Sequence, residues 1–428
     1  MIEYSNKRLN EKYYKLTHKS GLDIFVFPKK LSSAYAMFGT KYGSIDNVFR
    51  LKGEKDFTTV PDGIAHYLEH RMFTQKDGSD ITERFSEVGA DSNAYTSHNK
   101  TVYLCSATEG MEEAFYHLLN FVTEPNFTEE LVEKERGIII QEIKMSDDSP
   151  YSRVYTALLE AMYKHNSVRV DIAGTVESVS QITAEMLNKC YDTFYNPANM
   201  VAVVCGDVDP QKILEVADRA LPDSFKAKEI ERKYCESEPA EVNESLKKCY
   251  MQVSKPIFTI GVKDVDISES AEIRTRKFAA MSLLSDMLFS KSGELYNTLI
   301  DEGRVLPDFY ASYNMSEQFA YLIISGESDD PDGVLQYIKS YISSYKLDEA
   351  AFERSKRAIY ADFVMGFDST DEIANNLMDF IFEGIDMFAY GETLLDVKIE
   401  EIDALLKEFF KDEYFSTSVV YPLESERS

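Results

Sequence analysis

The amino-acid sequence predicts an α+β fold of two homologous domains, each a mostly antiparallel sheet covered by helices. Two observations support this prediction. Strand-like runs are followed by helical patterns in the first half of the chain, and the second half repeats that order. The chain has 428 residues, more than one ordinary domain, and 44% of them are hydrophobic, which is enough to bury two cores.

The first half contains strand-like runs, which show period-two alternation or are rich in β-branched and aromatic residues. Its helical patterns have apolar residues at intervals of three and four. Thr128, followed by two glutamates, is typical of a helix N-cap with acids in the first turn. The strands are expected over residues 22–28, 35–43, 93–107 and 200–205, and the helices over residues 109–122, 129–145 and 185–194.

The second half repeats landmarks of the first half in the same order. A helix ending at Phe73, a loop and a helix ending at Gly89 match a helix ending at Phe289, a loop and a helix ending at Gly303. Both halves also close with a helix that leads into a final strand. Because two matches occur in the same order, we interpret the chain as an internal duplication.

The stretch between the two patterns is charged and has no apolar periodicity, which is typical of an inter-domain linker. The predicted organisation is therefore a first domain over residues 1–224, a linker over residues 225–254 and a second domain over residues 255–428.

Charge and composition exclude several classes of partner. The 46 Lys and Arg against 74 Asp and Glu give a net charge of −28, which argues against binding to nucleic acid or to anionic membranes. No apolar run approaches the roughly 18–20 residues of a membrane span, and the start of the chain lacks the pattern of a secretory signal.

The cysteines indicate the compartment. The chain has five of them, an odd number, and they are scattered along the sequence, so we expect reduced thiols in a cytoplasmic protein.

Two of the six histidines stand four residues apart in the run HYLEH, residues 66–70. The run lies on a helix expected to begin near Asp62, so both imidazoles face one side and Glu69 lies within the same arc. Hydrolytic zinc sites take three protein ligands and leave the fourth position to water. We therefore predict that His66 and His70 bind one zinc ion per chain, with Glu69 as the general base.

The helix expected over residues 129–145 offers the third ligand. Most of its acids lie in the first turns, where the helix dipole alone accounts for them. Glu142 differs because it follows an apolar run and is expected in a buried stretch, so it is the candidate ligand. Glu135 lies two turns earlier on the same face and is expected to act beside the metal ligands. The alternative for Glu135 is an exposed acid in a charged half-helix.

These residues resemble the signature of the pitrilysin-type inverzincin peptidases, a family that includes mitochondrial processing peptidase and insulin-degrading enzyme. The resemblance covers the first half residue by residue and the second half in layout only. The segments that carry it are the inverted H-x-x-E-H at residues 66–70, ERGIIIQE at 135–142, SNAYT at 92–96, FYNPANM at 194–200 and Gly206-Asp207.

The resemblance implies a role for each matching residue of the site. His66, His70 and Glu142 would bind zinc, Glu69 would be the catalytic base, and Glu135 would be an accessory acid near the metal.

The resemblance also implies a substrate site on the strand that begins at Asn93. In the family the equivalent strand is a sheet edge on which the peptide lies extended, bound through its main chain. Asn93, Ala94 and Tyr95 would then contact the substrate. An ordinary core strand is the alternative for this segment.

One part of the family pattern is absent from the second half. Full-length members use an Arg and a Tyr, seven residues apart, to donate hydrogen bonds to the substrate carbonyl, a large catalytic contribution in such sites. By alignment the Arg falls at Ile300, which cannot donate, and Arg304 with Tyr310 is a poor substitute. The residues that align with His66, Glu69 and His70 are Ser282, Ser285 and Asp286.

The chain therefore resembles the zinc-bearing subunit of half-size, two-subunit processing peptidases, in which a paralogous zinc-free partner supplies the Arg and Tyr. The expected function is a zinc-dependent endopeptidase subunit that acts on unfolded oligopeptides or presequence-like segments. Two alternatives stay open. One is a non-catalytic assembly or core subunit that retains the metal site, and the other is a self-sufficient homodimeric peptidase that uses Tyr310 or Tyr313.

Overall fold

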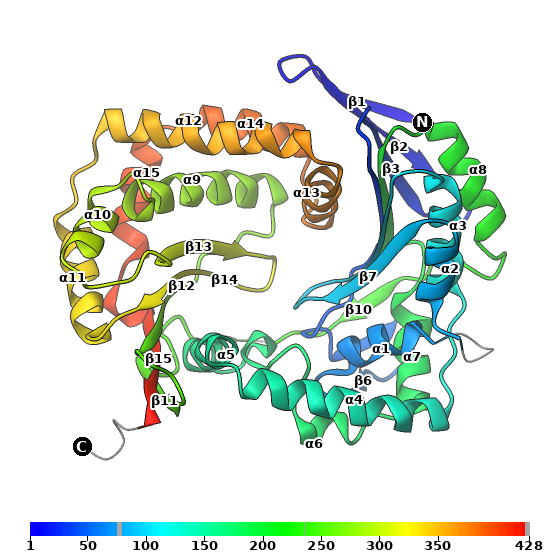
Figure 1. Ribbon diagram of the computed structural model, residues 1–428, viewed down its shortest axis with the longest axis horizontal. Helices are drawn as coiled ribbons and strands as arrows, with labels where there is room; N and C mark the ends of the chain where they lie inside the picture. Colours follow the sequence, from blue (N-terminus) through cyan, green and yellow to red (C-terminus); the bar gives the residue numbers. More distant parts are fainter. Residues whose placement is uncertain (75–78, 236, 424–428) are drawn as a thin grey trace. The chain divides into compact units, whose positions relative to one another are not determined.

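The structure is a computed structural model that describes residues 1–74, 79–235 and 237–423 (Figure 1). The described residues form two compact units, each with a sheet and helices packed against it, which confirms the predicted two-domain α+β fold. The units do not follow chain order. Unit 1 comprises Met1–Ile143, Asp171–Tyr234 and Val364–Phe388, and unit 2 comprises Lys144–Val170, Cys235–Phe363 and Ala389–Ser428.

Unit 1 is built on a seven-stranded sheet in which β1 and β7 are the edges. Neighbouring strands are antiparallel except β3 and β9, which are parallel. The central strand β9 is buried along its whole length, as its run of apolar residues predicts. In spatial order the strands are β1 (Ile2–Asn6), β2 (Glu11–Thr17), β3 (Asp23–Pro28), β9 (Met200–Gly206), β4 (Ala34–Thr40), β8 (Thr101–Ala107) and β7 (Ala90–Thr96).

Unit 2 is built on a five-stranded sheet that repeats five strands of unit 1 in the same order and with the same directions. Its first pair is parallel and the other three pairs are antiparallel, as in the series from β3 to β7. This agreement confirms the duplication that the sequence indicates. In spatial order the strands are β11 (Leu246–Met251), β15 (Phe415–Pro422), β12 (Ile257–Asp264), β14 (Ala320–Glu327) and β13 (Tyr310–Met315).

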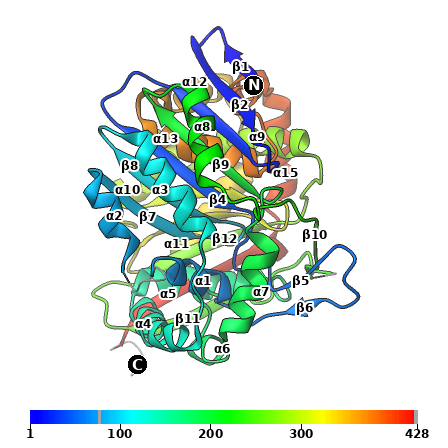
Figure 2. The same ribbon diagram turned by 90° about the vertical axis from the view of Figure 1, so that its right-hand side faces the viewer.

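Helices lie between the strands along both halves of the chain. In Figure 2, α3 and α8 lie side by side in front of the seven-stranded sheet, and they contact each other and its strands. No helix in the described ranges is long and apolar enough to span a membrane. The helices are α1 (Ile64–Met72), α2 (Ile81–Glu87), α3 (Met111–Thr123), α4 (Glu129–Asp147), α5 (Pro150–Met162), α6 (Val176–Val179), α7 (Ala184–Phe194), α8 (Pro210–Ala220), α9 (Ala271–Phe289), α10 (Glu294–Asp301), α11 (Pro331–Ser344), α12 (Glu349–Met365), α13 (Thr370–Phe382), α14 (Met387–Asp396) and α15 (Ile399–Phe409), with short 3-10 turns at Ser167–Arg169, Gly366–Asp368 and Asp412–Tyr414.

Each sheet is covered by a helix from the other half of the sequence. Helix α13 packs on β4 and β9 in unit 1, whereas α5 packs on β11, β12 and β15 in unit 2. In both cases the helix approaches a glycine in a central strand. A Cβ on Gly39 of β4 would lie 3.0 Å from Phe382, and a Cβ on Gly261 of β12 would overlap Met162. The small residue therefore permits the close approach of the exchanged helix.

The run predicted as one strand over residues 93–107 is a hairpin of two strands instead. β7 and β8 pair from Ala90 with Ala107 to Thr96 with Thr101. The turn between them is closed by Ser97 N donating to Lys100 O at 2.8 Å. The turn residues Ser97, His98 and Asn99 interrupt the β-type pattern only briefly, so the pattern alone does not reveal the reversal.

The charged stretch interpreted as a linker contains the strands β10 (Ile230–Arg232) and β11. Strand β10 forms a second small sheet in unit 1 with β5 (Val48–Leu51) and β6 (Thr58–Thr59).

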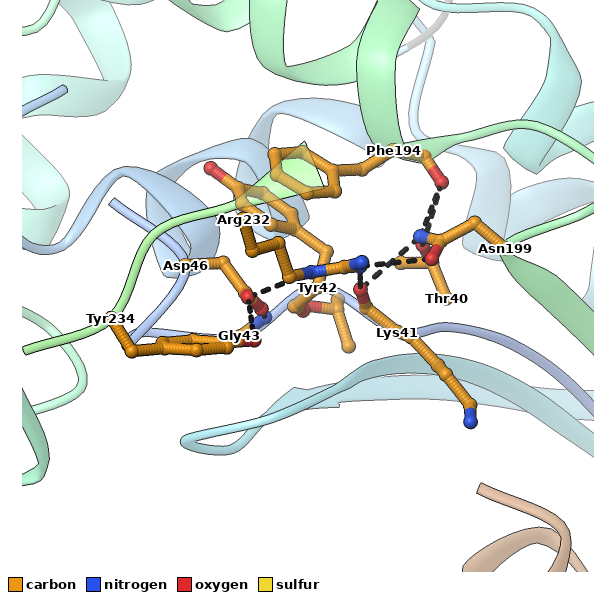
Figure 3. Close-up of polar contacts among 10 residues, drawn as sticks. Thr40, Lys41, Tyr42, Gly43, Asp46, Phe194, Asn199, Arg232 and Tyr234 are labelled. Carbon is orange, nitrogen blue, oxygen red and sulfur yellow. Dashed lines mark hydrogen bonds and ion pairs between the residues drawn. The ribbon is translucent and has the colours of Figure 1, made fainter. Parts of the chain in front are cut away.

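A buried carboxylate binds the end of β10 and the residues after it to the rest of unit 1. Asp46 accepts hydrogen bonds from Gly43 N, Arg232 Nε and Tyr234 OH, each at 2.9 Å, and Arg232 also donates to Asn199 Oδ1 at 2.9 Å (Figure 3). Burial raises the pKa of the Asp46 carboxyl, while Arg232 opposes that shift.

Candidate metal centre

Helix α1 carries the histidine motif at the surface of the unit 1 core. Its residues Ile64, Ala65, Leu68 and Met72 are buried in that core. The hydroxyl of Tyr67 donates to the carbonyl oxygen of Val132, which fastens α1 against α4. Because the apolar positions fix which side of α1 faces the core, they also fix the direction of the two histidines between them.

His66, His70 and Glu142 bring their donor atoms together. His66 Nε2 lies 3.7 Å from Glu142 Oε1, and His70 Nε2 lies 3.2 Å from Glu142 Oε2. One donor atom from each residue lies within 4.8 Å of the other two. Two ligands about 2.05 Å from a tetrahedral ion are about 3.3 Å apart, so this donor set fits zinc. No second group of three such donors converges in the part of the chain that the structure describes.

The surroundings of Glu142 differ from the expectation. The sequence suggested a buried stretch, but 47% of the Glu142 side chain is exposed, and Ile138 on the same helix is 51% exposed. The apolar residues before Glu142 are therefore divided between the core, where Ile139 is buried, and the open side of α4. Glu142 lies with the histidines, as the sequence predicts, but the expectation that it belongs to a buried stretch was wrong.

The two imidazoles have different electrostatic environments. Burial lowers the pKa of His66 to about 4, and His70 adds to the effect. Burial also acts to lower the pKa of His70, but the hydrogen bond to Glu135 and the charges of Glu142 and Glu69 outweigh it and raise the pKa. A neutral imidazole is the form that binds a metal.

Glu69 lies beside these three candidate ligands and is 8% exposed. Burial raises the pKa of its carboxyl, and a 2.6 Å hydrogen bond from Thr96 Oγ1 to Glu69 Oε2 partly opposes that shift. A cleft of about 430 Å³ opens next to Glu69, with Phe73, Asn93 and Ile138 among its lining residues. A buried carboxylate beside an open cleft is suited to general-base chemistry.

Glu135 contacts one of the histidines through one oxygen and an arginine through the other. Its Oε1 lies 3.1 Å from His70 Nδ1, and its Oε2 accepts from Arg71 Nη1 at 3.4 Å. The hydrogen bond with His70 lowers the pKa of the Glu135 carboxyl, although burial opposes the shift and Arg71 assists it. The sequence prediction includes neither Arg71 nor Thr96. Two features of the sequence could have identified them: Arg71 is a charged residue within the apolar pattern of α1, and Thr96 ends the family-like segment SNAYT.

The predicted substrate residues lie on β7, at the edge of the seven-stranded sheet. Asn93 is exposed, and Ala94 and Tyr95 are half-buried. The Ala94 N–H donates to Asn93 Oδ1 at 2.9 Å. Within the described residues β7 pairs with β8 alone, so its other edge has no strand partner.

The matching region of unit 2 carries different side chains. Ser282, Ser285 and Asp286 on α9 line a cavity of about 400 Å³ beside β13. These hydroxyls and one carboxylate are oxygen donors, whereas zinc in hydrolytic sites commonly takes histidine nitrogen.

The candidate substitutes for the missing Arg and Tyr differ in how available they are. Arg304 pairs with Glu302 and lies over the Tyr337 ring. Tyr313 is 8% exposed and donates to Asp264 Oδ2 at 2.6 Å, so its hydroxyl is already engaged within the chain. Tyr310 is 52% exposed at the start of β13.

Comparison with known families identifies both halves of the chain. Residues 58–176 match the family described as Insulinase (Peptidase family M16), and this range contains the histidine motif and Glu142. Residues 181–359 match the domain described as Peptidase M16 inactive domain.

Relatives extend the match over the whole chain. A Bacillus subtilis (strain 168) protein named uncharacterized zinc protease YmfH is 35% identical over 98% of this chain and 99% of its own length. A crystal structure of an M16-like peptidase from Alicyclobacillus acidocaldarius is 36% identical, with a TM-score of 0.91 over 96% of this chain and 98% of that chain. The periplasmic protease PqqL from Escherichia coli shares the fold, with 16% identity and a TM-score of 0.72 over 95% of this chain and 47% of that chain. These findings support a peptidase-type enzyme, and the full-length relatives show that the chain belongs to the pitrilysin-type peptidase family M16.

Proposed function

We propose that this chain is a zinc-dependent endopeptidase subunit that hydrolyses peptide bonds in unfolded oligopeptides or presequence-like segments. The observation that carries the proposal is the meeting of four side chains. His66, His70 and Glu142 present donor atoms to one point, and Glu69 stands beside them. Zinc at that point would supply Lewis acidity, which polarises the scissile carbonyl and makes water a stronger acid.

Glu69 would take the proton from the attacking water and return it to the leaving amine. Its carboxyl is buried next to the candidate ligands and faces the cleft, which is the position that a general base needs. Thr96 binds one carboxylate oxygen and so restricts the rotation of the base. Glu135 would serve as the accessory acid by orienting His70.

The edge of β7 that has no strand partner supports binding of an extended peptide. Main-chain hydrogen bonds along a strand edge do not depend on side-chain identity, which suits substrates of varied sequence. The contacts would come from Asn93, Ala94 and Tyr95. The Ala94 N–H, now bonded to the Asn93 side chain, could donate to a peptide carbonyl instead.

We further propose that a paralogous zinc-free partner completes the site with an Arg and a Tyr. Three observations support this: Ile300 stands where the family has its Arg, Arg304 is engaged by Glu302, and Tyr313 is engaged by Asp264. The chain also covers 47% of PqqL, a longer protein with the same fold, which is consistent with a site shared between two chains of this size. A homodimer that uses Tyr310 is the competing arrangement. The five cysteines are free, which supports a cytoplasmic location.

The decisive variant for catalysis is Glu69→Gln. It should retain zinc, measured by elemental analysis, and should lower peptide hydrolysis by about 10²–10⁴-fold because a general base is removed. His66→Ala is the matched control and should lose both zinc and activity. A Glu69→Gln chain that cleaves peptides at the wild-type rate would refute the proposal and favour contamination or a different base.

The need for a partner is tested by mixing this chain with the paralogous chain. The purified chain should bind zinc but cleave peptides slowly, and addition of the paralogous chain should raise the rate. Full activity of the isolated chain at all concentrations would exclude the need for a partner, and activity that rises with its own concentration would favour the homodimer.

A further inference from the structure

Arg71 is almost completely buried, with 1% of its surface exposed, and it follows the ligand candidate His70 directly in the sequence. Burying a guanidinium is costly unless its donors are paired, and the two terminal nitrogens of Arg71 are paired, whereas its Nε has no hydrogen-bond partner among the described residues. Its Nη1 donates to Thr74 Oγ1 at 3.2 Å and to Glu135 Oε2 at 3.4 Å, and its Nη2 donates to Asn126 O at 3.2 Å. Two of these contacts hold the helix end in place, and the third leads to the metal centre.

Glu135 connects Arg71 to His70. One carboxylate oxygen accepts from the arginine, and the other lies 3.1 Å from His70 Nδ1. With Oε2 engaged by a fixed cation, the Glu135 carboxylate plane cannot rotate freely, and Oε1 is held towards the imidazole. The direction of the His70 ring therefore depends on a side chain that is not itself a ligand.

This connection selects the tautomer of His70. An ionised carboxylate can only accept, so it takes the Nδ1–H and leaves the lone pair of Nε2 towards Glu142 Oε2, which lies 3.2 Å away. His66 lacks such an arrangement, because its Nδ1 is buried and has no hydrogen-bond partner within the described residues. Of the two histidines, His70 is therefore the one whose ring is oriented by a neighbouring side chain.

The positive charge of Arg71 also offsets negative charge around the two histidines. Three carboxylates, those of Glu69, Glu135 and Glu142, surround the two histidines. Among the described residues, Arg71 is the one arginine or lysine that forms an ion pair with any of the three. A divalent cation together with one guanidinium balances three carboxylate charges. Without the guanidinium, Glu135 would be a partly buried carboxylate with only an imidazole partner, and it could turn away from His70.

We infer that Arg71 is a positioning residue that acts through Glu135 to orient His70 for the metal ion. The inference rests on the proposed zinc site. The competing explanation is that Arg71 only fastens the end of α1 to Thr74 and Asn126. The two explanations differ in their effect on metal affinity, because a purely structural contact would alter the stability of the metal-free protein and leave the affinity unchanged.

The test measures zinc affinity by competition with a chelator, and thermal unfolding of the metal-free chain, for the full-length protein. Arg71→Met should weaken zinc binding by about 10–100-fold, the usual effect of removing support from a metal ligand. Arg274→Met is the matched control. Arg274 is equally buried and donates to two backbone carbonyls and to Glu317, but it lies in unit 2. It should lower the unfolding temperature without changing zinc affinity.

Two further variants test the route through Glu135. The double variant Arg71→Met with Glu135→Gln should bind zinc no more weakly than Glu135→Gln alone, because both changes interrupt the same connection. Arg71→Lys retains the positive charge beside Glu135 and should recover part of the lost affinity, and it replaces Arg71→Met if that variant does not fold.

Three outcomes would overturn the inference: wild-type zinc affinity in Arg71→Met, independent effects in the double variant, or no recovery with lysine. Failure of the wild-type chain to bind zinc would instead overturn the proposed function.

Discussion

Thr96 Oγ1 donates a 2.6 Å hydrogen bond to Glu69 Oε2, and this bond joins the last residue of the edge strand β7 to the middle of helix α1. The candidate general base and the candidate peptide-binding strand are therefore linked directly. A peptide that lies along β7 would be aligned relative to the carboxylate that is to activate water. The bond also supplies a donor to a carboxylate that is only 8% exposed.

Thr96→Val should slow catalysis without removing the metal. The change retains the shape of the side chain but leaves Glu69 buried without its hydroxyl donor. A hydrogen bond to a charged group contributes about 1.5–3 kcal/mol, so kcat should fall by roughly 10–100-fold. The measurement is peptide hydrolysis under conditions in which the wild-type chain turns over, with zinc content determined in parallel. Thr96→Ser, which retains the hydroxyl, is the control, and equal loss in both variants would contradict the explanation.

Zinc should stabilise the chain against heat. An ion that binds only the folded state at 100 times its dissociation constant adds about 2.7 kcal/mol. Calorimetry with zinc and with a chelator should therefore show a higher unfolding temperature for the zinc-loaded wild-type chain. His66→Ala should abolish the difference, whereas His117→Ala, a change on α3 outside the three candidate ligands, should retain it. An identical shift in His66→Ala would mean that zinc binds elsewhere.

His98 should make the fold sensitive to acid. It is 9% exposed and its Nδ1 lies 3.0 Å from Ser44 Oγ, and burial lowers its pKa to about 4. The unfolded chain, with an ordinary pKa near 6.5, binds the proton first as the pH falls. Stability therefore declines from about pH 6.5 towards pH 4, by about 2 kcal/mol at about pH 5.

The variant His98→Asn tests this expectation, since asparagine can replace the bond to Ser44 but does not titrate. Urea unfolding at neutral pH and at about pH 5 should show a smaller acid loss in the variant than in the wild-type chain. An equal loss in both proteins would assign the acid sensitivity to other groups.

Two glycines of unit 1 should respond to alanine in opposite directions. Gly137 lies inside α4 with open space where a Cβ would stand, so Gly137→Ala should stabilise the protein by about 0.5–1 kcal/mol. A Cβ on Gly43 would overlap the main chain of His98 and Asn99, so Gly43→Ala should destabilise it by about 1–3 kcal/mol. Denaturant unfolding compares the two variants, and a stabilising Gly43→Ala would show that the turn after β7 can move freely.

Much of the fold follows from local pattern. Helices α3, α4 and α7 and strands β3, β4 and β9 lie within a few residues of the predicted ranges, because apolar spacing and caps are properties of the nearby sequence. The hairpin of β7 and β8 was predicted as one strand, since a short turn barely alters the alternation. The exchange of α5 and α13 between the sheets was not predicted, because the spacing of apolar residues shows that a helix face is buried but not which sheet buries it.

The sequence by itself determined the motif and its family. The four-residue spacing of His66 and His70 fixes two imidazoles on one face of any helix that contains them, and Glu69 must lie beside them. The tertiary structure decided which side chains from different helices and strands contact one another. The packing of α1 against α4 brings Glu142 and Glu135 to the histidines, and the β7 edge brings Thr96 to Glu69. These contacts join residues far apart in the chain, so they depend on how the buried faces pack, which no local pattern specifies.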